Sequence, residues 1–252
     1  MSGVTIKSQR EIELMREAGK RLGEVHNRLA EEVASGISTW DLDRLGEELI
    51  RKSGSIPSFL NYEGYPASVC VSINDEVVHG IPKKDRIVKE GDIVSLDIGL
   101  IYQGYQSDAA RTHAVGNVSE EAMNLIRVTE QSFFEGIQFA RAGNHLHDIS
   151  NAIGYYCIDR GYGVVRDLVG HGIGQELHES PQIPNFPQKR KGILLMAGMT
   201  LAIEPMINIG RGDVVFSDDG WTCTTEDGSL SSHYENTILI TEGDPEILSL
   251  VQ

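Results

Sequence analysis

The stretch from Ile93 to His113, IVSLDIGLIYQGYQSDAARTH, constrains the fold of this chain more than any other segment. A run rich in β-branched residues is followed by a short polar turn and a second strand-like run, which predicts a β-hairpin. We expect the turn to be centred between Tyr102 and Gln103, with five residues separating it from an aspartate on each side. Asp97 and Asp108 would then face each other across neighbouring strands.

Two facing aspartates on adjacent strands are unfavourable unless positive charge compensates them. Burial of an unneutralised carboxylate costs several kcal/mol, a second carboxylate adds repulsion, and aspartate is depleted in strand interiors. Asp97 and Asp108 therefore indicate a metal ion between them. The alternative interpretation is a hydrated hairpin with both aspartates on its exposed face, because most aspartates in proteins are exposed.

Size and composition limit the class of protein. The 252 residues, 40% of them hydrophobic, suffice for a full core in one large domain or two small ones. The apolar runs are too short to span a bilayer, and the N-terminal segment lacks the apolar region of a secretory signal, so no membrane association is expected. Three scattered cysteines, Cys70, Cys157 and Cys223, favour a reducing, cytoplasmic location. A net charge of −15 makes nucleic acid an unfavourable partner.

Apolar periodicity at spacings of three and four predicts four helices, with approximate bounds 8–33, 39–54, 119–141 and 148–161. Ser8 and Glu11 form a predicted capping box at the start of the first. His26 lies beside the apolar stripe of that helix and is interpreted as structural or exposed. His145 and His147 are interpreted as residues of a hydrated connection between the last two helices.

The second half of the chain repeats the plan of the first. Residues 169–173 (VGHGI) echo residues 78–81 (VHGI), and residues 198–204 echo residues 91–97, each with a glycine followed six residues later by a carboxylate. A further strand in each half carries one more acid. The matching order predicts two halves related by a pseudo-twofold axis, in one domain, with the site on that axis.

These strands supply a candidate metal-ligand set of mostly hard oxygen donors with one imidazole. That mixture suits Mn, Fe or Co, also admits Zn, and disfavours a thiolate-type structural zinc site. The sequence contains no HExxH, Walker, GxGxxG or GxSxG motif. It therefore gives no support to a zincin, a P-loop protein, a Rossmann dinucleotide-binding protein or a common serine hydrolase. The set consists of Asp97, Asp108, His171, Glu204 and Glu235.

With these motifs the whole chain resembles the type I methionine aminopeptidases, of the short bacterial kind. The resemblance implies an α/β (α+β) pita-bread fold, a pseudo-twofold antiparallel sheet with flanking helices, in a single catalytic domain over residues 1–252. It also implies removal of the N-terminal methionine from nascent chains when the second residue is small, with two divalent metal ions. The matching motifs are His79 in VVHGIP, Asp97 in SLDIG, Asp108 in YQSDAART, His171 in VGHGIG, His178 in ELHE, Glu204 in IEPM and Glu235 in SHYENT.

The resemblance also implies roles for the metal ligands. Asp97 and Glu235 would bridge the two ions. Asp108 would hold one ion, and His171 and Glu204 the other. Two ions about 3.5–4 Å apart acidify a shared water that attacks the first peptide carbonyl.

The remaining implied roles concern proton transfer and substrate binding. Glu204 would act as general base and then acid, His178 would hydrogen-bond the scissile peptide group, and His79 would position the peptide and assist the leaving nitrogen. Phe59 and Leu177 stand where relatives often have Cys and Phe, which affects the pocket's shape. The methionine side chain would lie in an apolar sleeve formed by Phe59, Tyr62, Tyr65, Cys70 and Trp221.

Several alternatives stay open at the level of sequence. A proline-specific peptidase of the same fold would use the same ligands, although its relatives usually carry an additional N-terminal domain. A metal-free creatinase-like hydrolase and a catalytically dead, protein- or ribosome-binding relative are the others, and both would be expected to lack ligands. The resemblance suggests a monomer, and ribosome docking would suit an enzyme of nascent chains, although no motif indicates it.

Overall fold

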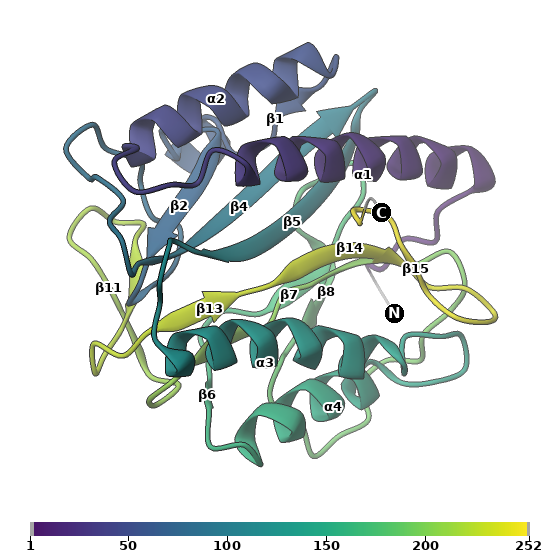
Figure 1. Ribbon diagram of the computed structural model, residues 1–252. Helices are drawn as coiled ribbons and strands as arrows, with labels where there is room; N and C mark the ends of the chain where they lie inside the picture. The colour runs from purple at the N-terminus through teal and green to yellow at the C-terminus, as the bar shows by residue number, and fades with distance from the viewer. Residues whose placement is uncertain (1–2, 251–252) are drawn as a thin grey trace.

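The computed structural model describes residues 3–250. In this part of the chain, helices cover one face of an antiparallel sheet whose strands differ in length (Figure 1). Two helices pack over each half of the sheet. None of the helices in residues 3–250 is long and apolar enough to cross a bilayer. The helices are α1 (Gln9–Ala30), α2 (Thr39–Lys52), α3 (Glu120–Ile137) and α4 (Leu146–Ile158), with a short 3₁₀ turn at Tyr62–Gly64.

The main sheet has nine strands within the described residues, and its central path runs β1-β4-β5-β14-β9-β7-β8. Its strands are β1 (Ile56–Pro57), β2 (Val69–Ile73, beside β4), β4 (Ile93–Tyr102), β5 (Tyr105–Ala114), β7 (Gly170–Gly172), β8 (Glu179–Ile183), β9 (Thr200–Ile203), β14 (Glu235–Leu239) and β15 (Glu246–Ile247, beside β14). Two small sheets complete the described fold, formed by β13 (Ser231–His233), β10 (Met206–Asn208) and β6 (Gly163–Val164), and by β11 (Val214–Phe216), β12 (Cys223–Thr225) and β3 (Glu76–Val78).

The strand order has the predicted twofold character. β5 and β14 are antiparallel at the centre, β4 and β9 flank them, and β2 and β7 lie outside those. This arrangement is the pita-bread fold. The echo between the two His-Gly-Ile segments is nevertheless not a topological equivalence, because His171 lies in β7, the counterpart of β2, whereas His79 follows β3.

The hairpin of β4 and β5 forms as predicted, but the predicted position of its turn is wrong. The central turn residues are Gln103 and Gly104, whose φ angles are 47° and 86°, and a two-residue turn of this kind needs positive φ at both positions. Asp97 therefore pairs with Ala110 and not with Asp108. Because the register shift is two residues, both aspartates stay on one face as diagonal neighbours.

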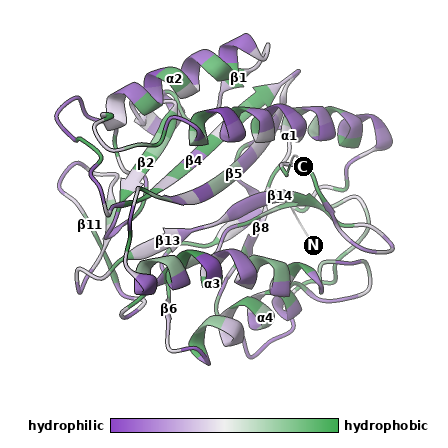
Figure 2. Ribbon diagram, viewed as in Figure 1, coloured by the Kyte–Doolittle hydropathy of each residue, from purple (hydrophilic) through white to green (hydrophobic). Residues whose placement is uncertain are grey.

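Alternation along the strands separates the hydrophobic core from the carboxylates. Leu96 and Ile98 are fully buried in the core under α1 and α2, so Asp97 between them points to the opposite face. In the other half Ile238 packs under α3 and α4, and Glu235 faces the other way. Figure 2 shows hydrophobic and hydrophilic residues mixed along α1 and α3. This is expected for helices that pack one face on a sheet and expose the other to solvent.

The predicted helices are present, with differences at their ends. The capping box of Ser8 with Glu11 is confirmed. Helix α3 ends at Ile137 and not near Arg141, because the next amides bond three residues back in tighter turns. Likewise, α1 ends at Ala30, short of the predicted bound.

Helix α4 begins earlier than predicted. The carboxylate of Asp148 accepts a hydrogen bond from the backbone N–H of His145 (2.8 Å), so Asp148 is the third residue of the helix and not its first. His147 therefore lies in the first helical turn, and its Nδ1 lies 2.6 Å from the carbonyl of Arg190. His26 is buried, with Nε2 2.8 Å from the carbonyl of Ala109, which agrees with its structural interpretation.

Candidate active site

One cavity of about 160 Å³ contains every side chain that the sequence selected for metal binding, catalysis or the methionine sleeve. Both the metal-ligand candidates and the aromatic residues line it. The cavity is lined by Phe59, Tyr62, Glu63, Tyr65, Cys70, His79, Asp97, Asp108, His171, Leu177, His178, Glu204, Trp221 and Glu235.

The four carboxylates come from the four central strands. Asp97 lies in β4, Asp108 in β5 and Glu235 in β14, and Glu204 follows β9 directly. Backbone pairing between these strands fixes their relative positions, so the centre of the sheet supports the site. Glu235 is only 2% exposed and Asp108 only 4%.

Several oxygens of this cluster have no hydrogen-bond partner. Oδ1 of Asp97, Oδ1 of Asp108 and Oε1 of Glu235 are buried and unpaired among the described residues. A buried polar atom without a partner is rare in native structures and requires compensation. The unpaired oxygens converge from different strands, so this donor set fits divalent cations.

Burial and mutual repulsion shift the protonation equilibria of the cluster. Desolvation raises the pKa of Asp97 to about 7. It also raises the pKa values of Asp108, Glu204 and Glu235 well above their ordinary range, and repulsion from neighbouring carboxylates adds to each rise. Without cations the cluster therefore cannot carry its full negative charge near neutral pH.

The donor atoms form two overlapping groups. One atom each from Asp108, His171 and Glu235 lie within 4.8 Å of one another, and the same holds for Asp97, His233 and Glu235. Nε2 of His171 is 3.5 Å from Oε1 of Glu204, beside the first group. Glu235 belongs to both groups, which is the arrangement needed to share a ligand between two ions.

His171 presents one ring nitrogen to the carboxylates. Its Nδ1 is 2.8 Å from the carbonyl of Gly172, so Nδ1 donates a proton and Nε2 keeps its lone pair. Burial, with a smaller contribution from His178, lowers the pKa of His171 to about 4. The ring is therefore neutral and can act as a nitrogen ligand.

His178 lies next to His171 and is oriented by Tyr62. Its Nδ1 is 2.9 Å from the hydroxyl of Tyr62, and its ring meets that of His171 edge-on at a centroid distance of 4.4 Å. With Tyr62 donating to Nδ1, the Nε2–H of His178 is free to donate to a bound molecule. His79 also lines the cavity. Its own backbone φ is 60°, an uncommon conformation for a non-glycine residue.

Aromatic residues form the apolar part of the cavity lining. The rings of Tyr65 and Trp221 pack edge-to-face at 5.2 Å, and the hydroxyl of Tyr65 donates to the carbonyl of Gly80 at 2.9 Å. Phe59 and Leu177 are almost fully buried beside them. Edges of aromatic rings are favourable partners for a thioether, so this end suits a methionine-sized, unbranched side chain.

Gly99 on β4 sets the position of Phe59. A Cβ added to Gly99 would lie 2.7 Å from Cε1 of Phe59 and 2.9 Å from Cβ of Ser58, closer than real Cβ atoms come. We therefore expect Gly99→Ala to push the Phe59 ring into the cavity and raise the KM for a methionyl peptide roughly tenfold, the scale of one methylene in an apolar pocket. Steady-state kinetics would measure this, with Gly243→Ala, which has an open environment, as the control. An unchanged KM would contradict the proposed role of Gly99.

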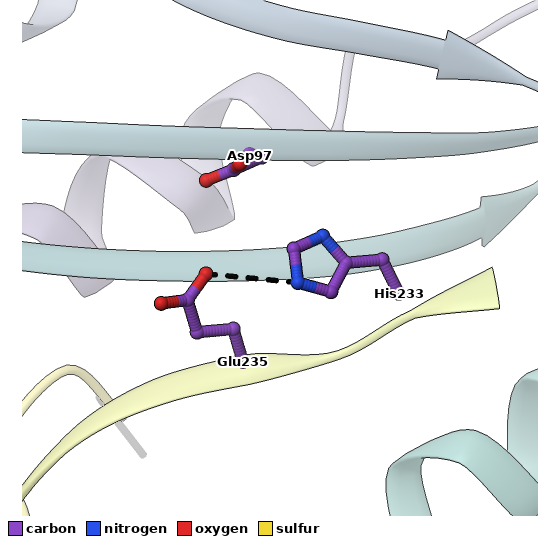
Figure 3. Close-up of side chains that lie close together, drawn as sticks. All are labelled: Asp97, His233 and Glu235. Atoms are coloured by element: carbon purple, nitrogen blue, oxygen red, sulfur yellow. Dashed lines mark ion pairs between the residues drawn. The ribbon is translucent and has the colours of Figure 1, made fainter. Parts of the chain in front are cut away.

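Two residues of the site, Glu63 and His233, are not identified by the sequence patterns. Glu63 lines the cavity from the 3₁₀ turn, where no local pattern identifies it. His233 lies two residues before Glu235 and therefore on the same face of that segment (Figure 3). The two-residue periodicity around Glu235 could have revealed it.

Comparisons with known proteins agree with this geometry. The family model of metallopeptidase family M24 matches residues 13–242. A methionine aminopeptidase from Clostridium perfringens is 54% identical over 249 residues, covering 99% of this chain and all of that protein. The crystal structure of a methionine aminopeptidase from Thermotoga maritima matches with a TM-score of 0.96 and 45% identity, over 98% of this chain and all of that one. A Xaa-Pro dipeptidase from Bacillus anthracis matches with a TM-score of 0.80 but only 24% identity, over 98% of this chain and 62% of that one, and so shares the fold.

Proposed function

Because this chain belongs to metallopeptidase family M24, we propose that it uses two divalent ions to remove the N-terminal methionine from peptides and nascent proteins whose second residue is small. The observation that carries this proposal is the cluster of buried, unpaired carboxylate oxygens in a cavity that aromatic residues also line. The chain is a metal-dependent aminopeptidase, and the similarity to methionine aminopeptidases over its whole length favours methionine over proline-specific substrates.

We propose a ligand arrangement that follows the two donor groups. Glu235, which belongs to both groups, would be a ligand of both ions. The resemblance implied that Asp97 is the other shared ligand, but Oδ2 of Asp108 lies 4.0 Å from Nε2 of His171 in the first group, which favours Asp108 in that role. His171 and Glu204 would complete the ligands of one ion, and Asp97 would hold the other. Mn, Fe, Co or Zn would satisfy this donor set.

Bound divalent ions at this site would supply an acidified water and a Lewis acid for the first peptide carbonyl. The carboxylate of Glu204 takes the proton of the attacking water and later delivers it to the leaving amide nitrogen. The Nε2–H of His178 donates to the peptide oxygen as its negative charge grows. His79 borders the same cavity and positions the peptide segment that leaves.

His178→Ala is expected to lower kcat roughly 10²-fold while leaving metal binding intact, because His178 donates to the reacting peptide and is assigned no metal. Turnover of a Met-Ala-Ser peptide and calorimetric metal titration would separate the two effects. Tyr62→Phe, which removes only the hydroxyl partner of Nδ1, should give a smaller loss. Loss of a bound ion in His178→Ala would instead identify His178 as a ligand.

The enclosed cavity predicts a strong preference for methionine at the first position. Release of the first residue from Met-Ala-Ser should exceed release from Ala-Pro by at least about tenfold, since alanine leaves the aromatic sleeve unfilled. The assay should be run with Co, Mn, Fe and Zn and with a chelator, which should stop the reaction. Faster cleavage of Ala-Pro would support a proline-specific peptidase of the same fold.

The finer features of the proposal follow from its substrate. Nascent proteins are made in the cytoplasm, and the buried free thiols of Cys70, Cys157 and Cys223 are compatible with that reducing compartment. We propose a monomer that meets its substrates near the ribosome. Gel filtration and co-sedimentation with ribosomes would test these two points.

A further inference from the structure

His233 is a buried histidine whose two ring nitrogens both lack a partner. The residue is only 1% exposed, and neither Nδ1 nor Nε2 has a hydrogen-bond partner among the described residues. A buried imidazole without partners is costly, because both nitrogens lose their hydrogen bonds to water. The other two buried histidines, His26 and His171, each have one nitrogen satisfied by a backbone carbonyl, so His233 requires a separate explanation.

The ring of His233 is turned toward the carboxylate cluster. Its Nε2 is 3.8 Å from Oε2 of Glu235, and Figure 3 shows the two side chains facing each other with the carboxylate of Asp97 on the same side. One donor atom from each of these three residues lies within 4.8 Å of the other two. A separation of 3.8 Å is too long for a hydrogen bond between His233 and Glu235.

The spacing of these atoms fits two ligands that share one ion. An imidazole nitrogen offers a lone pair to a metal ion. Two ligands of one ion lie at most about 4.4 Å apart when metal–ligand bonds are about 2.2 Å, so shifts of a few tenths of an ångström would suffice for joint ligation.

We propose that Nε2 of His233 is a ligand of the metal ion that Asp97 and Glu235 hold. The ring carries its proton on Nδ1 and donates the Nε2 lone pair, so each of the two ions has one imidazole, from His171 and from His233. The inference rests on the proposed two-ion site. A nitrogen donor at the second position shifts its preference toward Co, Fe and Zn relative to Mg, which carboxylates alone would accommodate.

The test compares metal binding by the wild type, His233→Gln and His171→Gln. Calorimetric titration of the metal-free proteins with Co²⁺ should show two ions in the wild type. His233→Gln should weaken the binding of one ion by at least about tenfold and leave the binding of the other unchanged. Loss of a residue that only hydrogen-bonds a ligand already costs about tenfold, so loss of a ligand should cost at least as much. His171→Gln should weaken the other ion. His113→Gln, which replaces another histidine outside the cluster, serves as the control and should change neither.

Pulsed electron paramagnetic resonance of the Mn²⁺-loaded proteins gives a readout independent of affinity. The wild type should show nitrogen modulation from two imidazoles. His233→Gln and His171→Gln should each show modulation from one imidazole, and the variant that carries both substitutions should show none. Melting of the metal-free His233→Gln protein at the wild-type temperature would show that the fold is retained. Should that variant fail to fold, His233→Asn in the same spectroscopic experiment replaces it.

The outcomes separate this inference from the proposed function. Two tightly bound ions in the wild type, with unchanged affinities and nitrogen modulation in His233→Gln, would overturn the role of His233 and leave the two-metal peptidase intact. A wild type that binds no ion would overturn both. Loss of one nitrogen signal together with weaker binding of one ion would establish His233 as a ligand.

Discussion

Replacing Glu204 with glutamine is expected to lower kcat for a Met-Ala-Ser peptide roughly 10³-fold, which is within the range of general acid–base catalysis. Glutamine has nearly the same shape and keeps a carbonyl oxygen that can face an ion, but it cannot accept a proton from water near neutral pH. Glu204 is the only one of the four carboxylates in the described cluster that follows its strand instead of lying within it. Its Oε1 lies 3.5 Å from Nε2 of His171, and its side chain lines the cavity that would hold the peptide.

Metal content must be measured in the same Glu204→Gln sample, because Glu204 is also assigned as a ligand. Glu226→Gln, on the exposed surface where Glu226 pairs with Arg211, is the matched control and should retain full activity. A Glu204→Gln protein that holds its ions and still cleaves at near-normal rate would refute the proton-transfer role. Loss of the ions alone would be corrected by raising the metal concentration, and loss of the base would not.

Alternation of residue types made most of this site predictable from the sequence. Asp97 interrupts a buried apolar run at a position that can only face away from the helices, and the same is true of Glu235. The motifs around His79, His171 and His178 then connected distant segments that no local rule would bring together. All these side chains line one cavity.

Features that depend on backbone dihedrals or on tertiary contacts were not predictable. The hairpin turn moved because Gln103 accepts a positive φ beside Gly104, a conformation that its residue type disfavours. The start of α4 depends on the carboxylate of Asp148 capping the amide of His145, where a capping residue was expected to precede the helix. The two-residue spacing could have placed His233 on the face of Glu235, but the lack of hydrogen-bond partners for its ring depends on tertiary contacts that the sequence does not show.

The metal-free protein is expected to lose stability as the pH rises above about 7.5, whereas the metal-loaded protein should not. The pKa of Asp97 is raised to about 7, and the pKa values of Asp108 and Glu235 are raised further above their ordinary range. A raised carboxyl pKa favours the folded state at low pH, and this contribution is lost as the pH rises through the folded-state value. Each group that is still protonated only in the folded state lowers the free energy of unfolding by about 1.4 kcal/mol per pH unit.

The pH window matters because the buried histidines act in the opposite direction. His79, His171 and His233 have pKa values lowered to about 4, 4 and 3, so they destabilise the folded state as the pH falls below about 6.5. Above about pH 7.5 these rings are neutral in both states, so the raised pKa values of Asp108, Glu204 and Glu235 determine the slope. Urea unfolding between pH 7.5 and 8.5 should therefore show a decrease of at least about 1 kcal/mol in the chelated protein.

Asp108→Asn isolates the origin of this effect. Asparagine removes one charge from the cluster, so the metal-free variant should be more stable than the metal-free wild type at pH 8 and should show a smaller pH slope. With saturating Co²⁺ the order should reverse, since the variant has lost an anionic ligand and gains less from metal binding. Asp213→Asn, at an exposed position, should match the wild type in both conditions. Equal stability of the chelated wild type and Asp108→Asn across this range would mean that the buried carboxylates do not repel one another, and the reason for placing cations among them would be lost.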